Sequence, residues 1–164
     1  MIPEFYQPAI VDGEQNMPIE PVLVGWNTSD QADFNRAVSR MCGRLYPHGF
    51  DISDTPPNSY IDLAVHVART GRMCVAKGCS HAIEFDSLKR WQQFRAWHDY
   101  CHIEGGHPFT LAGECAAVRM QIAMLRACYP SSKVARWTPI LVQQIIHDNF
   151  GEAAFCPATL RSKV

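Results

Sequence analysis

The segment HDYCHIEGGHPFTLAGE, residues 98–114, contains the side chains of this sequence best suited to bind a metal ion. His98 and His102 are four residues apart, so on a helix their imidazoles lie one turn apart on the same face. Two imidazoles in this arrangement can ligate one ion, as in the metalloprotease motif H-E-x-x-H. The same spacing also occurs on partly exposed helices that bind no metal, and His107 is expected to be an ordinary loop histidine.

A third ligand is expected from the next helix. One helix is predicted to end near Ile103, and Thr110 is the predicted N-cap of the following one. Because the connection is short, the two helices should pack as an antiparallel hairpin. Glu114, in the first turn of the second helix, would then face His102. Its carboxylate would complete a site of two histidines and one carboxylate, with positions left open for water or substrate.

Asp99 is the predicted catalytic residue. It lies about 100° around the helix from His98 and is an i,i+3 neighbour of His102. Its carboxylate is expected either to be a fourth ligand or to orient a metal-bound water. The predicted metal is Zn²⁺, or another divalent ion such as Fe²⁺ or Mn²⁺, which would act as a Lewis acid or activate a water molecule.

These residues resemble a known motif. HDYCH, followed by eleven residues and then Glu114, is similar to the H-D-x-x-H-(eleven)-E zinc motif of the coenzyme Q biosynthesis protein four family. Gly113 precedes the glutamate as in that family, and Ala117 and Gln121 continue the likeness, which covers about residues 91–122.

The resemblance implies a mostly helical fold and a bound zinc or similar divalent ion. In that family all four motif positions are assigned to the metal, which here are His98, Asp99, His102 and Glu114. The family is linked to removal of a ring carboxylate and ring hydroxylation during ubiquinone synthesis. The resemblance therefore implies a metal-dependent lyase or oxidative decarboxylase that acts on a small apolar or aromatic substrate, such as a compound like a prenylated quinone precursor.

Two other function classes remain open. Helical HD-type phosphohydrolases use an earlier histidine, a His-Asp pair and a later aspartate, an order matched by His66, His98, Asp99 and Asp148. A non-enzymatic structural or partner-binding protein could instead use the metal to staple its hairpin. A structural zinc site is closed by four protein ligands, whereas a catalytic one keeps an open position.

The sequence predicts an all-α, single-domain helical bundle over residues 27–164, preceded by an extended, proline-rich N-terminal arm over residues 1–26. The arm is expected to wrap the domain or to bind a protein partner, and PVLVGW (21–26) is a possible strand. The predicted helices start at Thr28, at Thr55 as N-cap, near Asp86 or Ser87, at Thr110 and at Thr138-Pro139; the basic segment SSKVARW (131–137) is predicted to be a connector.

Composition narrows the possible function classes and the expected location of the protein. The 164 residues carry a formal charge of −1 and are 47% hydrophobic, which argues against nucleic-acid binding by bulk charge. No apolar run reaches the roughly 18 residues of a membrane span, and the first ten residues lack a signal-peptide pattern, so a cytoplasmic location is expected. The seven cysteines are expected to be reduced, although Cys74 and Cys79 could form half of a zinc knuckle.

Overall fold

The computed structural model describes residues 28–78 and 85–150, the last seven of them by their backbone alone. The predicted N-terminal arm, the strand over 21–26 and Cys79 therefore lie outside the described residues. Within those residues the chain is mostly helical, which confirms the predicted all-α fold class. The elements are α1 (Thr28–Leu45), β1 (Asp51–Ser53), α2 (Tyr60–Thr70), β2 (Cys74–Ala76), α3 (Leu88–Gly105), α4 (Leu111–Arg126) and α5 (Ser131–Phe150).

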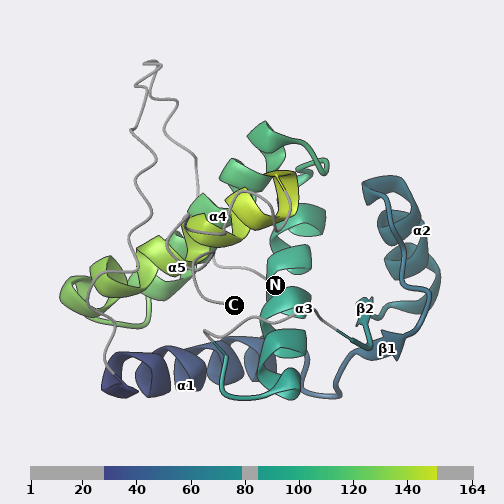
Figure 1. Ribbon diagram of the computed structural model, residues 1–164. Helices are drawn as coiled ribbons and strands as arrows, with labels where there is room; N and C mark the ends of the chain where they lie inside the picture. Colours follow the sequence, from purple (N-terminus) through teal and green to yellow (C-terminus); the bar gives the residue numbers. More distant parts are fainter. Residues whose placement is uncertain (1–27, 79–84, 151–164) are drawn as a thin grey trace, which may run out of the picture.

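Helix α3 is the centre of the fold (Figure 1). It packs against α4 on one side and crosses α1, while α5 packs on α4. Helix α2 and the two strands lie on the other side of α3. Apolar side chains from α1, α3, α4 and α5 meet in one core, whose largest fully buried members are Phe34, Phe94, Trp97, Leu125, Trp137 and Leu141.

The α3–α4 hairpin has well-defined ends. Ser87 caps the start of α3, and its side chain accepts a hydrogen bond from the Arg90 amide. Gly106 ends α3 in the left-handed conformation, with φ of 65°, which a residue with a side chain rarely adopts. Thr110 caps α4 by accepting from the Gly113 amide, as predicted. Only residues 106–110 separate the helices, so the predicted short connection is confirmed.

Helix α2 and its flanking strands form a small parallel βαβ unit that the sequence did not predict. Asp51 of β1 pairs with Cys74 of β2 in parallel register. Strands of three residues are too short to show an alternating pattern, so they leave little signal in the sequence. The predicted N-cap at Thr55 is wrong: Ser59 caps α2 and accepts from the Asp62 amide. Gly71 ends α2 in the left-handed conformation.

Helix α5 begins seven residues before its predicted start. It runs from Ser131, so the segment predicted as a basic connector forms its first two turns and Pro139 lies inside the helix. Val134, Trp137 and Leu141, at helical spacing on both sides of the proline, are each about 1% exposed or less. Burying three such side chains contributes about 1.5–3 kcal/mol each, which outweighs the roughly 3 kcal/mol cost of an internal proline. No helix among the described residues is long and apolar enough to cross a membrane.

Candidate metal centre

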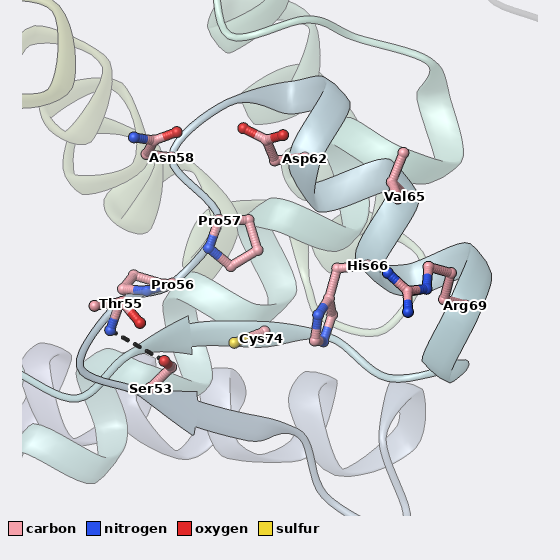
Figure 2. A pocket seen from close by; sticks show the side chains of 10 residues that line it. All are labelled: Ser53, Thr55, Pro56, Pro57, Asn58, Asp62, Val65, His66, Arg69 and Cys74. Carbon is pink, nitrogen blue, oxygen red and sulfur yellow. Dashed lines mark hydrogen bonds between the residues drawn. The ribbon is translucent and has the colours of Figure 1, made fainter.

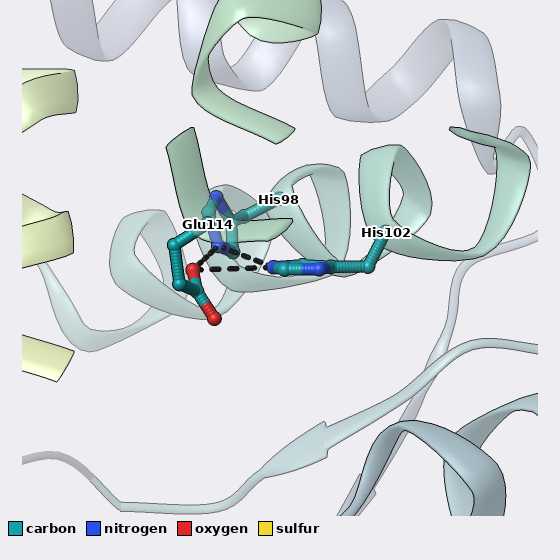
Figure 3. A group of neighbouring side chains, drawn as sticks. All are labelled: His98, His102 and Glu114. Carbon is teal, nitrogen blue, oxygen red and sulfur yellow. Dashed lines mark hydrogen bonds and ion pairs between the residues drawn. The ribbon is translucent and has the colours of Figure 1, made fainter. Parts of the chain in front are cut away.

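His98 and His102 project from one face of α3 and meet Glu114 of α4 (Figure 3). The Nε2 atoms of the two imidazoles lie 3.0 Å apart, and Oε2 of Glu114 lies 2.9 Å from the first and 3.2 Å from the second. All three residues are buried, and the histidines are only 1% and 0% exposed. The hairpin therefore brings together three of the four residues predicted as ligands.

A divalent ion fits these three atoms. A triangle with edges of 2.9, 3.0 and 3.2 Å has a circumradius of about 1.8 Å, which is shorter than zinc bonds of about 2.0–2.2 Å to imidazole nitrogen and carboxylate oxygen. One ion can therefore lie at bonding distance from both nitrogens and the oxygen together. Three protein ligands leave at least one position of a tetrahedral ion open.

The backbone fixes the tautomer of His102. Its Nδ1 lies 2.8 Å from the backbone carbonyl oxygen of His107. A carbonyl oxygen only accepts hydrogen bonds, so Nδ1 must carry a proton and donate it. In the neutral ring the lone pair is then on Nε2, the atom that faces Glu114. This arrangement is typical of metal-ligating histidines, whose second nitrogen donates to a carbonyl or carboxylate.

Gln121 has the same relation to His98. It is fully buried on α4, two turns after Glu114, and its Oε1 lies 3.0 Å from Nδ1 of His98. With the amide oxygen on this side, Nδ1 of His98 donates and Nε2 again presents its lone pair. Both imidazoles are therefore oriented with a metal-binding atom toward the carboxylate.

The centre is consequently a cluster of three acceptor atoms. Two neutral imidazoles and an ionised carboxylate repel one another at these distances unless a cation lies among them. A metal ion or a proton on one imidazole can supply that charge. The residues present thus suit a positively charged occupant, and the buried donor set of two nitrogens and one oxygen suits a divalent metal.

The protonated alternative appears in the pKa values of these groups. Burial acts to raise the pKa of Glu114, but hydrogen bonds from His102 and His98 outweigh it and hold the pKa well below its usual value. Burial acts to lower the pKa of His102, but the hydrogen bond and the charge of Glu114 outweigh it and raise the pKa above 6.5. Protons and metal ions therefore compete for the same atoms.

Aromatic rings surround the two imidazoles. Phe109, in the α3–α4 connection, contacts the His102 ring edge-on with centroids 4.8 Å apart, and Tyr60 at the start of α2 packs on Phe109. Phe94 is stacked on His98, with centroids 6.1 Å apart and an interplanar angle of 19°. The rings hold the imidazoles in place and make the surroundings of the centre apolar.

Asp99 lies outside the three-residue group. Its Oδ1 is 3.4 Å from a guanidinium nitrogen of Arg95, one turn earlier on α3, and the residue is 7% exposed. The structure thus places the predicted catalytic carboxylate beside a cation on the same helix. Its role as a fourth ligand or as a group that orients water stays a prediction.

His66 lies in a different part of the molecule. It lines an open cleft of about 510 Å³ between α2, β2 and the β1–α2 loop (Figure 2). Its Nε2 is 3.9 Å from Oδ2 of Asp51 and has no hydrogen-bond partner. Neither His98 nor Asp99 lines this cleft. The structure therefore does not bring the first histidine of the HD-type pattern to the metal centre, and the side chain of Asp148 lies outside the described residues.

The cysteines that the structure describes are free. Cys74 is the buried first residue of β2, and the rest of the possible zinc knuckle, Cys79 and His81, lies outside the described residues. That all seven thiols are reduced stays a prediction.

Sequence reasoning missed the two groups that orient the imidazoles. A backbone carbonyl, such as that of His107, leaves no signal in the residue type. Gln121 is seven residues after Glu114, so both lie on one helix face, and a polar residue in an otherwise apolar stripe was a usable signal.

Comparison of the chain with protein-family models, with curated proteins and with solved structures finds no match. The resemblance to the coenzyme Q biosynthesis protein four family therefore rests on the motif residues alone.

Proposed function

We propose that this protein is a divalent-metal enzyme whose ion is held by His98, His102 and Glu114. The observation that carries the proposal is the convergence of two Nε2 lone pairs and one carboxylate oxygen within 3.2 Å of one another. Each imidazole has its other nitrogen hydrogen-bonded to an acceptor, which is the arrangement that metal-ligating histidines use.

The number of protein ligands favours catalysis over a purely structural site. Structural zinc sites are almost always closed by four protein ligands, whereas two histidines and one glutamate form the ligand set of several zinc hydrolases. Glu114 also keeps its second carboxylate oxygen directed away from the imidazoles (Figure 3). A bound divalent ion at such a site would polarise a substrate oxygen or lower the pKa of a water molecule.

The surroundings favour a small apolar or aromatic substrate. Phe109, Phe94 and Tyr60 present aromatic surface near the imidazoles and exclude water from them. The motif likeness adds a more specific proposal, a prenylated quinone precursor that loses its ring carboxylate. In this proposal Asp99 acts either as a fourth ligand or as the base that orients water.

A stapling role is the second candidate, and one observation favours it. The histidines are almost fully buried, and neither the cleft around His66 nor the cleft around Tyr46 is lined by the three ligand residues. A metal here would then join α3 to α4 without contacting a substrate.

Metal content tests the proposal directly. We expect about one equivalent of a divalent metal in purified wild-type protein and a large loss in His98→Ala and Glu114→Ala. His66→Ala is the matched control, because His66 lines the cleft between α2 and β2, which none of the three ligands lines, and its removal should leave the metal content unchanged. Equal and negligible metal in all four proteins, measured after reconstitution with Zn²⁺, Fe²⁺ and Mn²⁺, would refute the metal centre.

Activity then separates the function classes. Loss of phosphodiesterase or nucleotidase activity in Asp148→Ala, with retention in Glu114→Ala, would favour the HD-type alternative. Loss of turnover of an aromatic carboxylate in Glu114→Ala, with retention in Asp148→Ala, would support the proposed enzyme. The stapling role would be favoured if the metal-loaded protein turns over neither substrate class and its melting temperature falls by many degrees when the metal is chelated.

A further inference from the structure

The Gln121 side chain is 0% exposed, and half of its amide has no partner among the described residues. Its Oε1 lies 3.0 Å from Nδ1 of His98, whereas its Nε2 makes no hydrogen bond to that part of the chain. A buried amide N–H group without an acceptor destabilises the folded state. A side chain chosen for stability alone would be apolar at this position, so the amide oxygen must serve another purpose.

We infer that Gln121 is a positioning residue of the proposed metal centre, holding Nδ1 of His98 protonated so that Nε2 is free to bind the ion. This inference rests on the proposed function. Gln121 does not touch the proposed ion or the carboxylate of Glu114; it acts only through the imidazole between them.

The geometry explains why the amide can have this effect. His98 is 1% exposed, so water cannot replace Gln121 as the acceptor for Nδ1–H. Without an acceptor, the neutral ring would favour the other tautomer, in which Nε2–H donates to Oε2 of Glu114 at 2.9 Å. In that tautomer Nε2, the atom that faces the centre, has no lone pair for a metal. Gln121 lies on α4, the helix that carries Glu114. One helix therefore supplies both a metal ligand and the acceptor that orients His98.

Gln121→Met separates positioning from structural support. Methionine has a similar volume and flexibility and removes both the acceptor for His98 and the unsatisfied N–H group. We expect this variant to be at least as stable as wild type without metal, yet to bind Zn²⁺ about 10- to 100-fold more weakly. Gln121→Glu keeps an acceptor for Nδ1 of His98 and should bind Zn²⁺ at least as tightly as wild type.

Gln92→Met is the matched control. Gln92 is also buried, at 7% exposed, but its amide donates to the backbone oxygen of Lys77 and contacts neither imidazole. This variant should lose stability because the Lys77 carbonyl loses its hydrogen-bond donor. Its Zn²⁺ affinity, measured by competition with a chromophoric chelator, should equal that of wild type.

Nitrogen NMR of the metal-free proteins gives a readout that a structural role would not change. The neutral His98 ring should carry its proton on Nδ1 in wild type and in Gln121→Glu, and on Nε2 in Gln121→Met. Wild-type affinity in Gln121→Met, or a tenfold loss in Gln121→Glu, would overturn the positioning role while leaving the metal centre intact. Wild-type protein that binds no Zn²⁺ would refute the metal centre and this role with it. If Gln121→Met does not fold, Gln121→Leu takes its place, and a failure of both would contradict the expected stability.

Discussion

Replacing Gly113 with alanine tests whether the start of α4 sets the position of the metal ligand beside it. A Cβ atom on Gly113 would lie 1.8 Å from the backbone oxygen of Pro108, so the backbone and not a flexible side chain would have to move. An ordinary contact needs about 3.4 Å, which requires a shift of about 1.6 Å between α4 and the connection before it. Glu114 is the next residue and would move with the helix.

The size of that shift decides the expected effect. Metal–ligand distances tolerate changes of about 0.2 Å, so a displacement of this size should take Oε2 of Glu114 out of bonding range of an ion held by the two histidines. We expect Gly113→Ala to weaken Zn²⁺ binding about 10- to 100-fold and to lower the free energy of unfolding by about 1–3 kcal/mol. Chelator competition and chemical denaturation measure the two quantities.

Gly43→Ala is the matched control in another helix. A Cβ atom at Gly43 meets nothing within 4 Å, so alanine should fit there without any shift. Its higher helix propensity should add up to about 1 kcal/mol to stability and leave metal affinity unchanged. If Gly113→Ala binds Zn²⁺ as tightly as Gly43→Ala does, the close approach of Pro108 does not position Glu114, and the argument from the hairpin connection fails.

Two further predictions follow from the pKa values and the burial of the thiols. The pKa of Glu114 is lowered and that of His102 is raised, so metal-free protein should be most stable between about pH 4.5 and 6.5. Below this window it should lose stability because Glu114 is protonated. Above the window it should lose stability because His102 loses its proton. Zn²⁺-loaded protein should instead gain stability with rising pH, and melting curves of metal-free protein that do not fall between about pH 6 and 9 would contradict the pairing. Burial raises the pKa of Cys42 to about 11 and raises that of Cys101, whereas Cys128 is exposed. Brief treatment of native protein with iodoacetamide should therefore label Cys128 first, and equal labelling of Cys42 would show that its helix opens readily.

The helices were predictable where caps and apolar spacing agree. Phe34, Val38 and Met41 recur at helical spacing after Thr28, and all three are buried in α1. In α5 the two signals disagree, because Pro139 indicates a start while the apolar stripe continues through it. Packing of that stripe determined where α5 begins, and a single sequence does not show how much core surface a helix will bury.

The site was predictable because its ligands lie close in sequence. A spacing of four residues places His98 and His102 on one face, and a short connection constrains where Glu114 can lie. Asp99 shows the limit of this reasoning. Consecutive helix residues point about 100° apart, and whether the neighbour reaches the ion or turns to Arg95 depends on side-chain rotamers that spacing does not determine.

The energetics of burial give the strongest general argument that this centre has a function. A carboxylate and two imidazoles lie between aromatic rings inside the hairpin. Apolar side chains could replace them without loss of stability, because replacing a buried ionic cluster by hydrophobic residues is often neutral or stabilising. Removing the solvent from such groups costs several kcal/mol per charge unless a partner compensates. Here even the orienting hydrogen bonds of His98 and His102 direct lone pairs inward, which increases the repulsion among the three groups. Such an arrangement stabilises the folded chain only when a cation is bound among them, so we expect folding and metal binding to be thermodynamically coupled.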